Sequence, residues 1–126
     1  MKTMKILVVD DDPLLRSLLS RFLKDYQDVQ VSGVVESGSE ALLKAKESRP
    51  DIVIMDIQLP DADPPSLIQK LRTISPSIRV YLCSAYSDEK VKTMVEHVGA
   101  NGFVSKSNLK EVLSLILQSE RSGTAV

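Results

Sequence analysis

Polar residues that could do chemistry follow short apolar runs at four places in this chain of 126 residues, namely at Asp10-Asp11-Asp12, Asp56, Ser84 and Lys106. Carboxylate oxygens suit Mg²⁺, which keeps several waters in proteins and often binds a phosphate oxygen as well. These residue types therefore indicate a site that handles a phosphoryl group with a divalent cation, provided that the fold brings them together.

The charges of these residues support the same chemistry. Three carboxylates held within a few ångströms repel one another, so such a cluster normally contains a cation or has raised pKa values. One Mg²⁺ and the ammonium group of Lys106 would balance Asp10, Asp11 and Asp56, so a phosphoryl group could approach without crossing a net negative field. An all-oxygen donor set suits Mg²⁺ better than zinc. We expect Asp12 to cap the helix that follows it.

The elements that must position these residues alternate along the chain. Short apolar runs are separated by longer segments whose apolar residues recur every three to four positions, which is typical of βα units around a parallel sheet. The predicted strands are residues 6–9, 29–35, 52–55, 80–83 and 103–104. The predicted helices are residues 13–23, 37–48, 66–74, 88–98 and 109–117, with Pro65 opening the third. Since ligands of such sheets bind at the carboxyl ends of the strands, the polar groups should meet at one edge.

The composition limits the class of protein. Lys and Arg number 16 against 17 Asp and Glu, which gives a net charge of -1 without a basic cluster, so this chain is a poor candidate for nucleic-acid binding. Its apolar runs are far shorter than the roughly 20 residues of a membrane span, and no signal peptide fits. We expect a cytoplasmic domain over residues 1–119, followed by a flexible tail or the start of an interdomain linker over 120–126.

Four segments taken together resemble the receiver domain of two-component response regulators. They are Ile6-Leu7-Val8-Val9-Asp10-Asp11, Ile54-Met55-Asp56-Ile57-Gln58-Leu59-Pro60, Ser84-Ala85 and Gly102-Phe103-Val104-Ser105-Lys106. The resemblance covers nearly the whole chain. It implies an α/β fold of the flavodoxin-like (βα)5 type, with a doubly wound five-stranded parallel sheet in the order 2-1-3-4-5. It also implies a phosphoryl-accepting signalling switch that depends on Mg²⁺.

The resemblance also implies a role for each site residue. Asp56 would be the phosphoacceptor and a metal ligand, Asp11 a direct ligand, Asp10 a ligand through water, and Gln58 a ligand through its backbone carbonyl. Lys106 would bind the phosphoryl group, Ser84 would swing to a phosphoryl oxygen, and the Phe103 rotamer would follow Ser84. Such a domain assists its own phosphorylation and dephosphorylation without being an enzyme that acts on other substrates.

The implied partners are a sensor histidine kinase or phosphotransfer protein, and an output domain or effector protein. The output could be a DNA-binding domain outside this chain. Residues 88–98, 103–104 and 109–117 would form the output face, which could also carry a homodimer of the phosphorylated domain. No contact with a membrane or direct binding of nucleic acid by this chain is implied.

Two positions depart from the family pattern. Pro64 stands where receivers usually have a glycine, so the loop after Asp56 must follow another path, since proline fixes φ near -65°. Ser107 stands where many receivers have a proline after the lysine, and serine there is common in receivers attached to LuxR-type DNA-binding regions. We expect Asp61 and Asp63 to be solvated loop residues.

Two other function classes compete with the switch. A phosphorylation-independent interaction module with the same fold is supported by the altered Pro64-Pro65 loop and opposed by the acidic residues. A metal-dependent phosphatase with an aspartyl nucleophile would need a second acid two residues after Asp56, where this chain has Gln58. The sequence therefore favours the switch.

Overall fold

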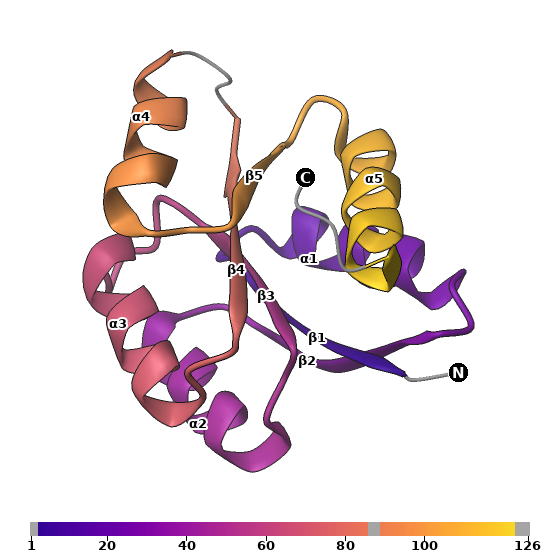
Figure 1. The fold of residues 1–126 in the computed structure, drawn as a ribbon, viewed down its shortest axis with the longest axis horizontal. Helices are drawn as coiled ribbons and strands as arrows, with labels where there is room; N and C mark the ends of the chain where they lie inside the picture. The colour runs from indigo at the N-terminus through magenta and orange to yellow at the C-terminus, as the bar shows by residue number, and fades with distance from the viewer. Residues whose placement is uncertain (1–2, 86–88, 123–126) are drawn as a thin grey trace.

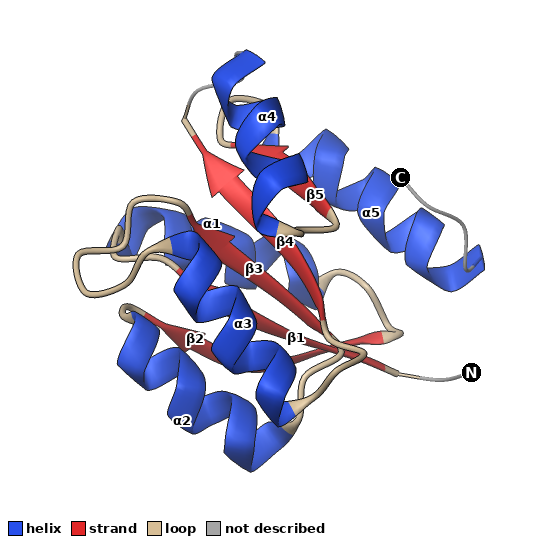
Figure 2. Cartoon of the chain, turned by 60° about the vertical axis from the view of Figure 1, so that its left-hand side comes forward, coloured by secondary structure: helices blue, strands red, loops and turns tan. Residues whose placement is uncertain are grey.

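The computed structural model describes residues 3–85 and 89–122, and these form a five-stranded sheet between two layers of helices (Figures 1 and 2). The strands are β1 (Met4–Val9), β2 (Val29–Val35), β3 (Ile52–Asp56), β4 (Arg79–Ser84) and β5 (Gly102–Ser105). The helices are α1 (Pro13–Lys24), α2 (Gly38–Ser48), α3 (Pro64–Ile74), α4 (Glu89–Val98) and α5 (Leu109–Ser122). All neighbouring strands are parallel, in the order β2-β1-β3-β4-β5. The predicted α/β fold and strand order are confirmed.

Each buried strand supplies both layers of the core. In β1, Ile6 and Val8 pack with residues of α1 and α5, whereas Leu7 and Val9 pack with residues of α2 and α3. This follows from the alternation of side chains along a strand, and it explains why the apolar runs are continuous. Helices α1 and α5 lie on one side of the sheet and α2, α3 and α4 on the other (Figure 2). The central strands are therefore held on both faces, and they fix the positions of the polar residues at their carboxyl ends.

Side chains that accept hydrogen bonds from backbone amides begin the first and third helices. Asp12 caps α1 by accepting from the amide of Leu14 at 3.0 Å, as the sequence predicts. Asp63 caps α3 by accepting from the amide of Ser66 at 3.1 Å, so it is a helix cap and not simply a solvated loop residue. Helix α3 therefore begins at Pro64, one residue before the predicted Pro65. Proline suits the first turn of a helix, where its missing N–H has no intrahelical partner.

The last helix is longer than the apolar pattern indicates. Helix α5 extends to Ser122, past the boundary expected after residue 119. Glu120 accepts hydrogen bonds from Arg79 and from the hydroxyl of Tyr81, the latter at 2.6 Å. Arg121 forms an ion pair with Asp28. The last turn is thus held by charged partners from other elements, which a search for apolar periodicity misses. Residues 123–126 of the expected tail, and Asp88 at the expected start of α4, lie outside the described residues.

Candidate functional site

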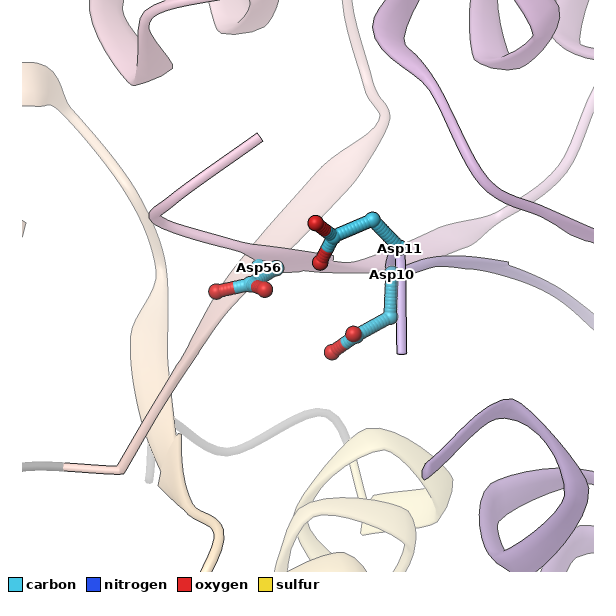
Figure 3. A group of neighbouring side chains, drawn as sticks. All are labelled: Asp10, Asp11 and Asp56. Carbon is cyan, nitrogen blue, oxygen red and sulfur yellow. The ribbon is translucent and has the colours of Figure 1, made fainter. Parts of the chain in front are cut away.

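Three carboxylates meet at the carboxyl ends of β1 and β3. Asp10 and Asp11 directly follow β1, and Asp56 is the last residue of β3. One oxygen from each lies within 4.8 Å of the others, and Figure 3 shows the three side chains beside one another. The parallel pairing of β1 with β3 explains this, because Val9 lies opposite Met55 and the next residue of each strand is therefore a neighbour. Asp10 and Asp56 are buried, and Asp11 is exposed.

A lysine reaches this cluster from the edge of the sheet. Lys106 follows β5, and its Nζ lies 3.3 Å from Asp10 Oδ2 and 3.3 Å from Asp56 Oδ2. The Lys106 amide donates a hydrogen bond of 2.8 Å to the carbonyl of Ser84, which ties the start of this segment to the end of β4. The fold thus brings one ammonium group and three carboxylates together. The most distant of these residues, Asp10 and Lys106, are 96 positions apart in the sequence.

The electrostatics of Asp10 favour an added cation. Burial raises the pKa of Asp10, and the negative charge of Asp56 acts in the same direction. The Asp12 amide, which donates to Asp10 Oδ1 at 2.9 Å, and the Lys106 ammonium act against this rise. Burial disfavours the charged form of Lys106, but Asp10 and Asp56 outweigh it and raise the pKa of that ammonium. Lys106 is therefore charged at neutral pH.

The donor set at this edge fits a divalent metal ion. Asp10 Oδ2 is buried and, among the described residues, accepts no hydrogen bond. Its ion pair with Lys106 supplies one positive charge for three carboxylates. Buried carboxylate oxygens with free coordination capacity are what a hard cation such as Mg²⁺ requires. The acidic cluster is thus suited to a divalent metal.

The remaining residues singled out from the sequence lie around this cluster. Gln58 donates its amide to Asp56 Oδ1 at 3.0 Å, so its backbone lies beside the carboxylate, and its side chain is exposed. Ser84 ends β4, is 2% exposed, and pairs in register with Ser105. Phe103, on β5, is half-buried and packs with the core on the side of α2, α3 and α4. Asp12 caps α1 and contributes its amide to Asp10.

Two supporting residues were not recognised in the sequence. Arg16 donates to the carbonyl of Asp10 at 2.8 Å, one turn into α1. Asp61 is an exposed loop residue, as expected, but it also accepts hydrogen bonds from the amides of Gly38 and Ser39, which the sequence analysis did not foresee. The position of Arg16, a basic residue in the first turns of the helix that follows Asp10 to Asp12, is a signal that could have indicated its contact with the acidic strand end. Nothing local to Asp61 indicates partners 22 and 23 residues away.

Comparison with known proteins assigns the family. The family model of the response regulator receiver domain matches residues 6–118, which include every residue of this site. The chain belongs to this family. Receiver domains are signalling components of two-component systems, so the predicted function, a phosphoryl-accepting switch, is confirmed at the level of the family, and the acidic cluster is consistent with it.

Individual relatives agree with this assignment. The receiver domain is 35% identical over 113 residues to the response regulator GacA of Pseudomonas protegens, covering 89% of this chain and 53% of GacA. The signal receiver domain of the putative response regulator NarL from Mycobacterium tuberculosis superposes with a TM-score of 0.83 at 27% identity, covering 96% of this chain and 98% of that one. A LuxR-family response regulator from Aurantimonas shares the fold, with a TM-score of 0.86 at 24% identity and coverage of 98% and 89%.

The match has a limited extent along the relatives. The chain spans about half the length of the curated relatives that it matches, with 53% of GacA covered. Among the residues that the structure describes, no helix is both long and apolar enough to cross a membrane.

Proposed function

We propose that Asp56 accepts the phosphoryl group from a phosphohistidine of a partner kinase or phosphotransfer protein. A carboxylate oxygen of Asp56 attacks phosphorus, the bond from phosphorus to the donor imidazole breaks, and the imidazole nitrogen leaves with the bonding electron pair and takes up a proton. The observation that carries this proposal is that Asp56, at the end of β3, lies beside the Asp10 and Asp11 carboxylates and has its Oδ2 3.3 Å from the Lys106 ammonium.

Each neighbour of Asp56 has a distinct part in this reaction. The Gln58 amide occupies Asp56 Oδ1, and Lys106 lies next to Oδ2, so the carboxylate is oriented before a donor arrives. Lys106 neutralises negative charge that develops on the transferring phosphoryl group. The same ammonium would hold the product aspartyl phosphate, to which Ser84 at the end of β4 would donate a hydrogen bond.

The metal that this site would hold is Mg²⁺. Asp11 would bind it directly, Asp10 through water, Asp56 through its carboxylate and Gln58 through its backbone carbonyl. When bound, the ion supplies positive charge to the phosphoryl oxygens. The buried Asp10 Oδ2 without a hydrogen bond supports this ligand set. We also propose that the same residues assist hydrolysis of the aspartyl phosphate, so the domain would promote its own dephosphorylation.

The output is proposed from the extent of the relatives. Because relatives such as GacA are about twice as long as the matched region, we infer that an output domain accompanies the receiver, and the LuxR-family likeness favours a DNA-binding one that regulates transcription. The face of α4, β5 and α5 would carry the change to that output and would pair two phosphorylated copies. A cytoplasmic location follows from this role, because kinases make phosphohistidine from ATP.

A phosphorylation-independent interaction module is the weaker alternative. Its support was the Pro64-Pro65 loop, and Pro64 stands at the start of α3, where proline fits the helix without strain. The altered loop is therefore compatible with an intact acidic site.

Intact-mass measurement separates the two functions. The domain is incubated with acetyl phosphate or phosphoramidate in the presence of Mg²⁺, with Asp56→Asn as the control. We expect one added phosphoryl group in the wild type and none in Asp56→Asn. An unmodified wild type would overturn the proposed switch and favour the interaction module.

A further inference from the structure

The carboxylate of Asp61 links two segments that are distant in sequence. Asp61 lies in the loop of residues 57–63 that follows the proposed phosphoacceptor. Its Oδ1 accepts from the amide of Gly38 at 2.8 Å and its Oδ2 from the amide of Ser39 at 3.1 Å. These amides belong to the first turn of α2, where N–H groups have no intrahelical acceptor and favour negative charge. The same hydrogen bonds lower the pKa of Asp61 and keep it charged.

Gly38 allows this close approach. A Cβ atom at Gly38 would lie 2.7 Å from Ala62 Cβ and 3.3 Å from Asp61 Oδ1, and the first of these distances is too short for two carbon atoms. Gly38 is buried under the loop. The loop therefore packs directly against the backbone of α2, and the space at Gly38, not its φ angle, is what requires glycine.

Other anchors of the loop lie at its two ends or are apolar. The Ile57 amide donates to the carbonyl of Cys83 at 3.1 Å, which ties the start of the loop to β4. Gln58 bonds to Asp56 two residues earlier, and Asp63 bonds to Ser66 three residues later. Leu59 is buried in the core on the side of α2 and α3. Asp61 instead ties the outer part of the loop to another helix, at a sequence separation of 22 and 23 residues. The contact of Asp61 with α2 thus limits how far the loop can move as a unit.

We propose that Asp61 is a positioning residue for phosphoryl transfer, which acts by fastening the 57–63 loop to α2 so that the Gln58 backbone stays beside Asp56. This inference rests on the proposed function, because Gln58 matters only if its carbonyl binds the cation. A ligand on a loop that is ordered in advance loses less conformational freedom when the metal binds. The fastening therefore strengthens Mg²⁺ binding and speeds phosphorylation at limiting Mg²⁺.

The first test compares two acidic residues at the same end of α2. Asp61→Ala removes the contact with the loop, whereas Glu40→Ala removes a carboxylate that bonds to the Glu36 amide at 3.0 Å. Mg²⁺ titrations followed by amide resonances, and initial rates with acetyl phosphate, are measured for both. We expect Asp61→Ala to raise the Kd for Mg²⁺ by about tenfold, the usual scale for residues that orient metal ligands. We expect Glu40→Ala to match the wild type.

The kinetics identify positioning as the cause. For Asp61→Ala the phosphorylation rate should recover most of its loss at saturating Mg²⁺, because Asp56 and Lys106 are unchanged. Asp61→Asn, whose amide oxygen can still accept one of the two hydrogen bonds, should be intermediate. A rate that stays low at saturating Mg²⁺, or a Kd for Asp61→Ala equal to that of Glu40→Ala, would overturn the positioning role.

A steric pair provides an independent test. Gly38→Ala should weaken Mg²⁺ binding as Asp61→Ala does, because its Cβ displaces Ala62. The double variant Gly38→Ala/Ala62→Gly removes the colliding Cβ and should restore the affinity. Failure of the double variant to recover any affinity would count against the contact between loop and helix. A wild type that neither binds Mg²⁺ nor accepts a phosphoryl group would instead overturn the proposed function itself, so the two failures are distinguishable.

Discussion

Lys106 Nζ lies 3.3 Å from Asp10 Oδ2, and that oxygen accepts no hydrogen bond from any residue that the structure describes. Asp10 is 1% exposed, so its carboxylate has lost most of its contact with water. The ion pair offsets part of this desolvation, but Lys106 is shared with Asp56 at the same distance. The metal-free pocket therefore carries more negative charge than its own residues balance.

This imbalance predicts that Asp10→Asn stabilises the metal-free domain. The asparagine can still accept the Asp12 amide, and Lys106 keeps Asp56 as its partner. We expect a gain of about 1 kcal/mol in the free energy of unfolding, measured by urea denaturation in EDTA. In saturating Mg²⁺ the advantage should shrink or reverse, because the wild type then gains from binding the ion. A less stable Asp10→Asn in EDTA would contradict a shared acidic cluster.

Removal of the metal should abolish phosphorylation without unfolding the domain. The two core clusters are made of apolar side chains from the sheet and helices, and none of them depends on the acidic pocket. With EDTA we expect no mass increase from acetyl phosphate and an unchanged far-ultraviolet circular dichroism spectrum. Excess Mg²⁺ should restore the modification. Loss of the helical spectrum in EDTA would mean that the metal has a structural role.

Ser84 should couple the aspartyl phosphate to the face of α4, β5 and α5. A hydrogen bond to a charged group contributes about 1.5 to 3 kcal/mol, so bonds from Ser84 and Lys106 together can shift a two-state equilibrium. We expect Ser84→Ala to remain phosphorylatable while beryllofluoride shifts amide resonances near the pocket and leaves those of α4 to α5 largely unmoved. The matched control is Ser105→Ala, at the neighbouring position of β5, which should respond like the wild type.

Movement of Ser84 would open space for Phe103, whose ring lies on the same side of the sheet as α4. Full-sized shifts across α4 to α5 in Ser84→Ala would therefore contradict the coupling. Such a result would leave the assignment of Asp56 as phosphoacceptor intact.

The contact of Glu120 with β4 should contribute to stability. Glu120 is nearly buried and accepts from both Arg79 and Tyr81. Glu120→Ala leaves the Tyr81 hydroxyl and the guanidinium without this acceptor, and we expect a loss of about 2 kcal/mol in the free energy of unfolding. Tyr81→Phe should lose about 1 kcal/mol. Urea denaturation measures both, with the exposed Gln118→Ala as control, and equal stability of Glu120→Ala and the control would refute the contribution.

The ion pair of Asp28 with Arg121 predicts a pH dependence in the acid range. The hydrogen bonds from Arg121 hold the pKa of Asp28 below its usual value of 3.8. A lowered folded pKa gives stability that is complete above 3.8 and is lost as the pH falls through the folded value. The difference in urea midpoint between the wild type and Asp28→Asn should therefore be constant near neutral pH and shrink as the pH falls below 3.8.

Arg121→Gln provides the control for this pH dependence. In that background the Asp28→Asn difference should be smaller and should vary less with pH, since the guanidinium that lowers the pKa is absent. An unchanged acid profile would show that another group holds the Asp28 carboxylate.

Local sequence patterns were enough to predict the parallel sheet, the alternation of strands and helices, and the residues at the strand ends. Continuous apolar runs such as Ile6–Val9 can be satisfied only by a strand covered on both faces, and a polar residue directly after such a run must lie at its carboxyl edge. The positions of Asp10, Asp56, Ser84 and Lys106 at one edge follow from these local patterns. The Asp12 cap follows in the same way, because a helix cap is a local interaction.

The long-range polar contacts depend on the packed fold and could not be predicted from local patterns. Asp61 is exposed in its loop, as expected, but nothing in that loop indicates its hydrogen-bond partners, which lie in the first turn of α2. Helix α5 was expected to end at residue 117, where the apolar pattern ends. Contacts of Glu120 with β4 and of Arg121 with Asp28 instead hold the helix as far as Ser122. Hydrogen bonds and ion pairs form wherever folding brings two groups within about 3 Å. The partners in these contacts therefore depend on how the elements pack, and no periodic pattern in the sequence indicates them.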